Sequence, residues 1–214
     1  MRLVCLLIFV LMGCAHAQAT PAVNEARKAF HSTVALELAN GDVYCSGVIV
    51  RRVVLTAEHC VAAAFPTWVR MADGTKFEVA LGMTNHTEDL AILMPIGVKL
   101  PRGVRVARKA PTWGDEVWVI GHPLGKYEYS ITRGVVSYPR RTNGIFGGVW
   151  LQHDAGTVGG NSGGPVLDGR GRLVGITSFG IIEPVVNGFG MQDTHLAGAV
   201  HLEAITRILA NAGL

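Results

Sequence analysis

The stretch CSGVIVRRVVLTAEHC, residues 45–60, combines an apolar, β-branched run with a cysteine at each end. Runs of this composition predict β-strands, here over residues 43–50 and 53–56. His59 follows the second strand and stands directly before Cys60. The partners that the rest of the chain offers to His59 therefore decide what this segment does.

Short β-branched or alternating runs recur along the chain, separated by Gly, Asn and Asp turn residues. They predict further strands at residues 33–38, 68–71, 77–81, 90–94, 116–120, 130–137, 149–153, 165–167, 173–178 and 198–200. Many short strands with such turns favour antiparallel barrels or sandwiches. Residues 99–112, which are interrupted by prolines and glycine, predict a connector between two β units.

Helical periodicity is confined to two segments, residues 23–30 and 201–212. In the second segment Leu202, Ile205, Ile208 and Leu209 share one face. We expect that face to pack against the β structure.

The first 19 residues predict an export signal, because Arg2 precedes a short apolar core that ends in small residues. The apolar core is too short to cross a bilayer. A second interpretation is a lipoprotein cleavage box that would leave Cys14 as a lipid-bearing N-terminus. The plain signal is favoured because Met12 is uncommon inside such a box. We expect an exported protein, periplasmic or secreted, with one mature domain over residues 20–214.

The charge pattern argues against several kinds of partner. The formal net charge is +3, and the lysines and arginines are scattered along the sequence. Neither a nucleic-acid stripe nor a polybasic membrane patch stands out, and no later segment is apolar enough to anchor the chain. We expect protein or peptide substrates, no nucleic acid and no transmembrane segment, with the oligomeric state open.

Cys45 and Cys60 are the cysteines beyond the signal region, which holds Cys5 and Cys14. In an exported protein such a pair most simply forms a disulfide. A loop of about 15 residues would contribute roughly 3 kcal/mol in the chain-entropy description. The alternative, a metal site of both cysteines and His59, is disfavoured because adjacent residues of an extended segment point to opposite faces. We expect no metal and no cofactor.

Three segments carry residue types that acyl transfer uses. TAEHC places His59 at a strand end, EDLAIL sets Asp89 before an apolar strand, and GGNSGGP presents Ser162 among four glycines. Glycines allow backbone amides to converge on one point. A serine hydroxyl is a weak nucleophile until a histidine takes its proton, and a carboxylate fixes the tautomer of that histidine. The chain order His, Asp, Ser is that of chymotrypsin-type enzymes.

From about residue 32 to residue 209 the chain resembles the trypsin-like serine proteases, and among them the HtrA/Deg type. The resemblance rests on CSGVIV and VVLTAEHC, followed in the family order by VIGHPLG (119–125), SITRGVVS (130–137) and LQHDAGTVGGNSGGPVLDGRGRLVGITSFG (151–180). HtrA proteins usually continue into a PDZ domain, and here we expect the protease domain without one.

The fold that this resemblance implies is all-β, with two six-stranded antiparallel β-barrels and a C-terminal helix. The first barrel is expected over about residues 30–105, the second over about residues 112–200 and the helix over about residues 201–212. The family position of Cys45 and Cys60 implies that their disulfide clamps the loop carrying the catalytic base.

The resemblance also implies a role for each site residue. Ser162 is the expected nucleophile, His59 the general base and then acid, and Asp89 the group that orients His59. The backbone N–H groups of Gly160 and Ser162 are expected to form the oxyanion hole, with Asn161 between them placed to help. The implied activity is that of a serine endopeptidase working through an acyl-enzyme on Ser162.

Four other polar residues near these segments are expected to have structural roles. They are His86, His122 and His153, interpreted as structural or surface histidines, and Asp154, interpreted as a loop-bracing carboxylate. Digestive trypsins have aspartate where this chain has Asn161, so activation by a new N-terminus is not expected.

The specificity pocket of this family is walled by the segment before the nucleophile and by a later strand. These walls comprise Ala155, Gly156 and Thr157 on one side and Thr177, Ser178, Phe179 and Gly180 on the other. Trypsin specificity needs a carboxylate six residues before the nucleophile, where this chain has Gly156. Glutamate-specific relatives place a histidine where this chain has Thr177. We therefore expect cleavage after small or medium apolar residues, in unfolded or flexible substrates.

Two other classes of function are weighed against this one. A catalytically weak relative could act as a protein-binding or chaperone module, but such relatives commonly lose a triad member and this chain keeps all three. A serine esterase would use the same acyl-transfer chemistry, but its usual Gly-x-Ser-x-Gly elbow does not surround Ser162. Peptide hydrolysis is the favoured interpretation.

Overall fold

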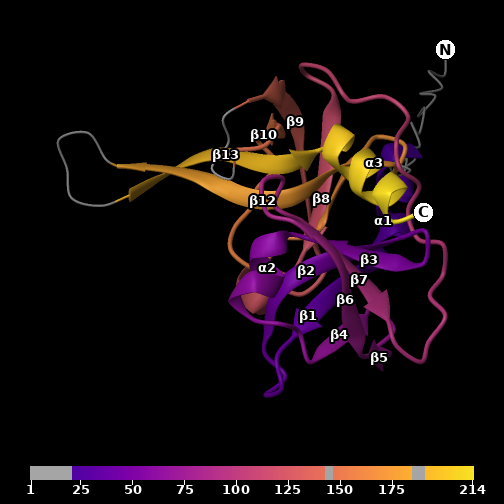
Figure 1. Ribbon diagram of the computed structural model, residues 1–214. Helices are drawn as coiled ribbons and strands as arrows, with labels where there is room; N and C mark the ends of the chain where they lie inside the picture. Colours follow the sequence, from indigo (N-terminus) through magenta and orange to yellow (C-terminus); the bar gives the residue numbers. More distant parts are fainter. Residues whose placement is uncertain (1–20, 143–146, 185–190) are drawn as a thin grey trace, which may run out of the picture.

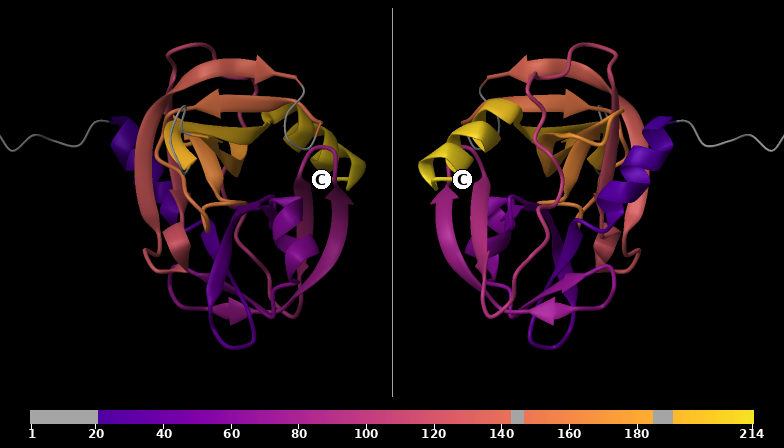
Figure 2. Two further views of the ribbon diagram at one scale, coloured as in Figure 1. Left: turned by 90° about the vertical axis from the view of Figure 1, so that its left-hand side faces the viewer. Right: turned by 90° about the vertical axis from the view of Figure 1, so that its right-hand side faces the viewer.

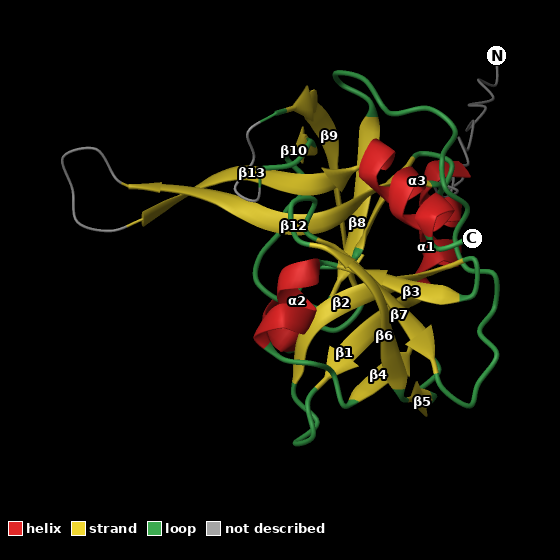
Figure 3. Cartoon of the chain, in the orientation of Figure 1, coloured by secondary structure: helices red, strands yellow, loops and turns green. Residues whose placement is uncertain are grey.

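The computed structural model describes residues 21–142, 147–184 and 191–214. The predicted signal over residues 1–19, which includes Cys14, lies outside these residues. Figure 1 shows two β units, with β1–β7 in one and β8–β13 in the other. Figure 3 shows that strands are the main regular structure of the chain and that its helices are short.

The first unit holds strands β1 to β7, with α1 preceding them and α2 between β3 and β4. Their bounds are α1 Pro21–Phe30, β1 Thr33–Glu37, β2 Val43–Val50, β3 Val53–Thr56, α2 Glu58–Ala63, β4 Trp68–Met71, β5 Lys76–Phe77, β6 Val79–Asn85 and β7 Leu90–Pro95. The sequence patterns predicted most strands of this unit approximately. One predicted strand over residues 77–81 corresponds to the two strands β5 and β6, and the short helix α2 was not predicted.

The strands of the first unit form one antiparallel sheet in the order β5-β4-β1-β2-β3-β7-β6. The expectation of a closed six-stranded barrel is therefore corrected, because the sheet has seven strands and its edges are β5 and β6. Only Glu78 separates these two edge strands in the chain. Because one residue joins the two edge strands, the sheet must curve until its edges approach each other at Glu78. Without the interruption at Glu78, β5 and β6 would form one strand.

The second unit is a closed barrel of six strands in the order β10-β13-β12-β11-β8-β9, as expected. Its elements are β8 Glu116–Gly121, the 3-10 turn η1 Pro123–Gly125, β9 Ser130–Arg141, β10 Trp150–His153, β11 Pro165–Asp168, β12 Leu173–Pro184, β13 Met191–His201 and the terminal helix α3 Leu202–Asn211. Strands β12 and β13 are longer than the sequence pattern predicted, and their hairpin extends beyond the barrel (Figure 1).

His201 caps the N-terminus of helix α3, because its ring Nδ1 accepts a hydrogen bond from the Glu203 N–H at 3.2 Å. The predicted apolar face of this helix is buried. Its residues Ile205, Ile208 and Leu209 pack in one core cluster with Leu55 and Ile92 of the first unit and with Ile120 and Ile176 of the second. The helix thus helps to hold the two units together at the junction where the site lies.

Candidate active site

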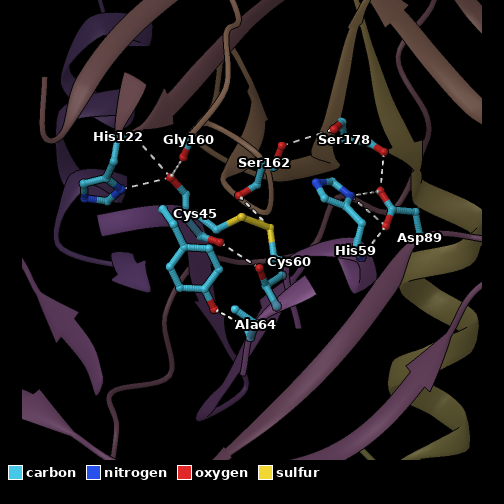
Figure 4. Close-up of a disulfide and its surroundings, with 12 residues drawn as sticks. Cys45, His59, Cys60, Ala64, Asp89, His122, Gly160, Ser162 and Ser178 are labelled. Atoms are coloured by element: carbon cyan, nitrogen blue, oxygen red, sulfur yellow. Dashed lines mark hydrogen bonds and ion pairs between the residues drawn. A yellow bond between two sulfur atoms is a disulfide. The ribbon is translucent and has the colours of Figure 1, made fainter. Parts of the chain in front are cut away.

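His59 and Asp89 are brought together by the pairing of β3 with β7. His59 lies in the first turn of α2, which follows β3, and Asp89 directly precedes β7. The ring Nδ1 of His59 lies 3.0 and 2.9 Å from the two carboxylate oxygens of Asp89, and the His59 backbone N–H donates to Oδ1 at 2.9 Å. The carboxylate therefore fixes both the backbone and the ring of His59 (Figure 4).

The Asp89 carboxylate is held in place from the second unit. Asp89 is 1% exposed, and the Ser178 hydroxyl donates a hydrogen bond to its Oδ2. Asp89 also has a positive φ of 48°, a left-handed conformation that aspartate tolerates better than most residues. Ser178 was expected to line the specificity pocket, whereas its side chain instead braces the acid.

Ser162 lies in the loop between β10 and β11, on the other side of the His59 ring from Asp89 (Figure 4). Its Oγ donates to the backbone carbonyl of Ser178 at 3.2 Å. Its own carbonyl accepts a hydrogen bond from the Ser46 N–H at 2.8 Å. The first unit thus anchors the loop that carries the predicted nucleophile.

The backbone before Ser162 is anchored through its carbonyl groups. The Gly159 carbonyl accepts a hydrogen bond from Leu124 N–H at 2.6 Å, and the Gly160 carbonyl accepts one from Ser46 Oγ at 2.8 Å. In a trans peptide the N–H points away from the carbonyl, so the Gly160 N–H is directed away from Leu124. Within the described residues, no protein acceptor is assigned to the N–H of Gly160 or Ser162. This arrangement suits an oxyanion hole.

Glycine is required at position 160 for two reasons. Gly160 has a φ of +92°, and a Cβ at this position would lie 2.2 Å from the His122 carbonyl oxygen. A larger residue would therefore move the loop that carries Ser162.

Asn161 does not join this group of donors. Its backbone N–H donates to the Val158 carbonyl at 3.1 Å, and the residue is 3% exposed. A Cβ on Gly121 would lie 2.5 Å from Asn161 Oδ1, so the amide packs directly against that glycine. This placement corrects the expectation that Asn161 helps in the oxyanion hole, because both its N–H and its side chain are directed into the protein.

His122 is buried beneath the same loop. Ser46 Oγ accepts a hydrogen bond from the His122 backbone N–H at 3.1 Å and lies 2.9 Å from ring Nδ1. Since the Ser46 hydroxyl proton goes to the Gly160 carbonyl, Nδ1 must carry the ring proton and donate to Ser46. Burial lowers the pKa of His122 to about 4, which keeps the ring neutral. His122 is thus structural, as the sequence suggested.

The side chains of the other predicted structural residues contact groups other than His59, Asp89 and Ser162. His153 is fully buried, and burial lowers its pKa to about 4. His86 is exposed and its Nδ1 lies 3.0 Å from a Glu58 carboxylate oxygen. The Asp154 carboxylate accepts a hydrogen bond from Val135 N–H at 2.6 Å. None of these groups competes with Asp89 for His59.

Cys45 and Cys60 are joined in a disulfide, with their Cα atoms 6.2 Å apart. Cys60 lies in α2 directly after His59, and its sulfur lies 3.7 Å from the Ser162 carbonyl oxygen. Donor atoms of Cys45, His59 and Cys60 lie within 4.8 Å of one another. This group does not suit a metal ion, because sulfurs bonded to each other offer no thiolate.

A cavity of about 220 Å³ adjoins the segment that leads to Ser162. Its lining includes Ala155, Gly156, Thr157 and Asn161, together with residues 195–197 of β13. The hydroxyls of Thr132 and Thr157, which also line it, donate to the carbonyls of Gly156 and Ala155. None of the described lining residues carries a carboxylate. The ionisable side chain among them is that of His195.

The predicted wall from β12 does not line this cavity. Thr177 is fully buried, and Ser178 is bonded to Asp89. The Phe179 ring lies 5.0 Å from the Trp150 ring and directly over Gly198, where a Cβ would meet it at 2.2 Å. Gly180 is also absent from the described lining. The cavity is instead lined by residues 195–197 of β13, and Gly198 leaves room for the Phe179 ring.

Known proteins resemble this chain in both sequence and structure. The family model described as a trypsin-like peptidase domain matches residues 45–176. A periplasmic DegP-like serine endoprotease of Pseudomonas putida is 35% identical over 127 residues, covering 58% of this chain and 26% of that protein. The Do-like HtrA serine protease of Bacillus subtilis is 32% identical over 158 residues, covering 68% of this chain and 35% of that protein.

A solved structure has the same fold. The HtrA-type protease AlgW, in complex with a decapeptide, superposes with a TM-score of 0.75 at 19% identity, covering 89% of this chain and 67% of that one. The chain spans about a quarter to a third of the length of the two curated relatives. No helix within residues 21–142, 147–184 and 191–214 is long and apolar enough to cross a membrane. On the family match, supported by the fold, this chain belongs to the trypsin-like peptidases.

Proposed function

We propose that this chain is a serine endopeptidase with Ser162 as nucleophile, His59 as general base and Asp89 as the orienting acid. The observation that carries the proposal is the buried Asp89 carboxylate bound to both the ring and the backbone N–H of His59. Since Nδ1 is bound to Asp89, Nε2 is the ring atom that would exchange a proton with Ser162.

The reaction would proceed in two steps. Ser162 Oγ attacks the substrate carbonyl carbon and gives its proton to His59, which then protonates the leaving amine as the C–N bond breaks. Water, deprotonated by His59, attacks the acyl-enzyme and releases Ser162. The N–H groups of Gly160 and Ser162 would donate to the oxyanion of each tetrahedral intermediate. Ser162 Oγ must first exchange its bond to the Ser178 carbonyl for one to His59.

The cavity beside residues 155–158 supports a proposal for the substrate class. Its lining of small residues without a carboxylate supports cleavage after small or medium apolar residues such as Ala, Val, Leu or Met. Such residues are mostly hidden in folded proteins, so unfolded or flexible chains are the proposed substrates. His195 at the rim makes acidic residues the competing preference, which cleavage profiling can separate.

The proposed location is outside the cytoplasm. The N-terminal 19 residues have the pattern of an export signal, the cysteine pair is joined, and the relative from Pseudomonas putida is periplasmic. Disulfides persist in such oxidising compartments. Whether Cys14 carries a lipid is decided by the mass of the mature N-terminal peptide.

The experiment is digestion of unfolded casein and of a proteome-derived peptide library by the purified chain. We expect casein cleavage, with small or medium apolar residues before the cut and no cleavage by Ser162→Ala. A dominant Arg, Lys or Glu signal before the cut would overturn the specificity alone. Absence of any peptide cleavage by folded protein would overturn the protease function in favour of a protein-binding module.

A further inference from the structure

A cavity of about 550 Å³ away from the triad is lined by arginines. They are Arg51 and Arg52 of the β2–β3 turn and Arg102, Arg105 and Arg108 of the connector between the two units. In the sequence these residues are about 50 positions apart and look scattered. The fold gathers them around one space, of a size that small ligands occupy in other proteins.

The backbone that presents these arginines is fixed to both units. The Val104 N–H donates to the Ile49 carbonyl at 3.0 Å, and the Leu173 N–H donates to the Arg105 carbonyl at 2.8 Å. Gly103 has a φ of +71°, and a Cβ there would lie 1.8 Å from the Ile49 carbonyl oxygen. The connector therefore lies tightly on β2 and β12, and the guanidinium groups start from fixed positions.

The turn that carries Arg51 and Arg52 is unusual in its composition. Val50 pairs with Val53, so these two residues form the whole loop of the hairpin. Their φ values are +49° and +72°, a conformation for which two-residue hairpins normally use Asn and Gly. Non-glycine residues held in this region cost energy, and such outliers concentrate at functional sites. Two adjacent arginines here point to a function for the side chains.

The described cavity lining places five guanidinium groups beside one carboxylate, the terminal one of Leu214. Across the described residues, none of the five guanidinium groups forms an ion pair with a carboxylate. By contrast, Arg70, Arg133, Arg140, Arg172 and Arg207 all pair with carboxylates. Arg52 donates to the Leu100 carbonyl at 2.8 Å, which still leaves donors for another group.

From this cluster we infer an anion-binding site for phosphate groups, formed by Arg51, Arg52, Arg102, Arg105 and Arg108. Guanidinium forks match phosphate oxygens two at a time and stay charged throughout physiological pH. The excess of five exposed guanidinium groups over one carboxylate favours a ligand with several negative charges, such as a polyphosphate or a phosphorylated headgroup, over a single carboxylate. The cavity is too small to hold a nucleic-acid duplex, whose protein interfaces are far larger.

The site is separate from the proposed catalytic centre. The connector runs along the side of the molecule away from α2, which carries His59 (Figures 1 and 2). None of the triad residues lines the arginine cavity. Binding there can therefore be measured in the inactive Ser162→Ala chain, and its failure would leave the protease proposal untouched.

The test is titration of Ser162→Ala protein with tripolyphosphate, followed by calorimetry and by thermal shift in about 150 mM salt, where distant charges are screened. We expect one saturable site and a rise in Tm with ligand. Arg51→Gln/Arg105→Gln should weaken binding by about tenfold or more, because each lost charge-assisted hydrogen bond is costly. The charge-matched control Arg133→Gln/Arg140→Gln on β9 should bind as the parent does.

Further arms identify the source of the phosphate. If the protein binds phosphatidylglycerol vesicles more tightly than phosphatidylcholine vesicles, and Arg51→Gln/Arg105→Gln removes this difference, the phosphate is that of a lipid headgroup. Tripolyphosphate binding without vesicle binding would assign a soluble phosphate ligand. No saturable binding, equal weakening in the control variant, or tighter binding of a hexa-aspartate peptide or a single-stranded oligonucleotide would overturn the proposal.

Discussion

Ser178 on β12 donates its hydroxyl hydrogen bond to Asp89, while its backbone carbonyl accepts one from Ser162. One residue of the second unit therefore contacts both the acid from the first unit and the predicted nucleophile of its own unit. The relative position of the two units is thereby coupled to the geometry of the site (Figure 4).

Replacing Ser178 by Ala should lower kcat and leave KM nearly unchanged. A hydrogen bond to a charged group contributes about 1.5–3 kcal/mol, which corresponds to a loss of about 10- to 100-fold. The matched control is Thr177→Val, because the buried Thr177 hydroxyl has no hydrogen-bond partner among the described residues. Steady-state kinetics on a peptide substrate give the answer, and equal kcat values for parent and Ser178→Ala would show that Asp89 needs no brace.

Replacing Asp89 by Asn should lower kcat by about 10⁴-fold, the loss typical when the histidine of a triad takes the wrong tautomer. The control is Asp154→Asn, since an amide oxygen can still accept the hydrogen bond from the Val135 N–H. The control should retain kcat within a few fold. If both substitutions lowered kcat alike, Asp89 would have no special role.

Replacing Cys45 and Cys60 by Ser should lower the free energy of unfolding by roughly 3 kcal/mol, as expected for a loop of about 15 residues. It should also lower kcat, because α2 carries His59 beside Cys60. Urea unfolding in the Ser162→Ala background measures the first effect. Mass spectrometry of unreduced mature protein should show the two cysteines linked, and two free thiols would remove the prediction.

Acid should destabilise the fold through its buried histidines. Burial lowers the pKa of His122 and His153 from 6.5 to about 4. Between these values the unfolded chain binds more protons than the folded one, so the stabilising effect is complete above pH 6.5 and is lost as the pH falls toward 4. Each histidine accounts for about 3 kcal/mol over this window.

Urea unfolding of Ser162→Ala protein at about pH 7.5 and at about pH 4.5 tests this dependence. His122→Gln should reduce the difference between the two pH values. Glu37, Glu128 and Arg70 also face His122, so Glu128→Gln serves as the control for charge effects on the ring. Equal stability at both pH values would contradict a neutral, buried His122.

The sequence predicted most strands because their apolar and β-branched runs are local signals, and the closed second barrel agrees with the expected fold. It did not predict α2, whose six residues carry no helical period. It also misplaced Ser178 and Asn161, since the direction of a side chain depends on strand register and on contacts such as that with Gly121. The sequence did not predict the arginine cavity, because residues 51–52 and 102–108 come together only in the folded chain.

The measurement that tests the central claim most directly is labelling of the purified chain with a serine-directed fluorophosphonate, followed by peptide mapping. The account predicts one label per molecule, on Ser162, with labelling slowed strongly in Asp89→Asn and abolished in Ser162→Ala while the fold is retained. Labelling of another serine, or casein cleavage that persists in pure Ser162→Ala protein, would contradict it.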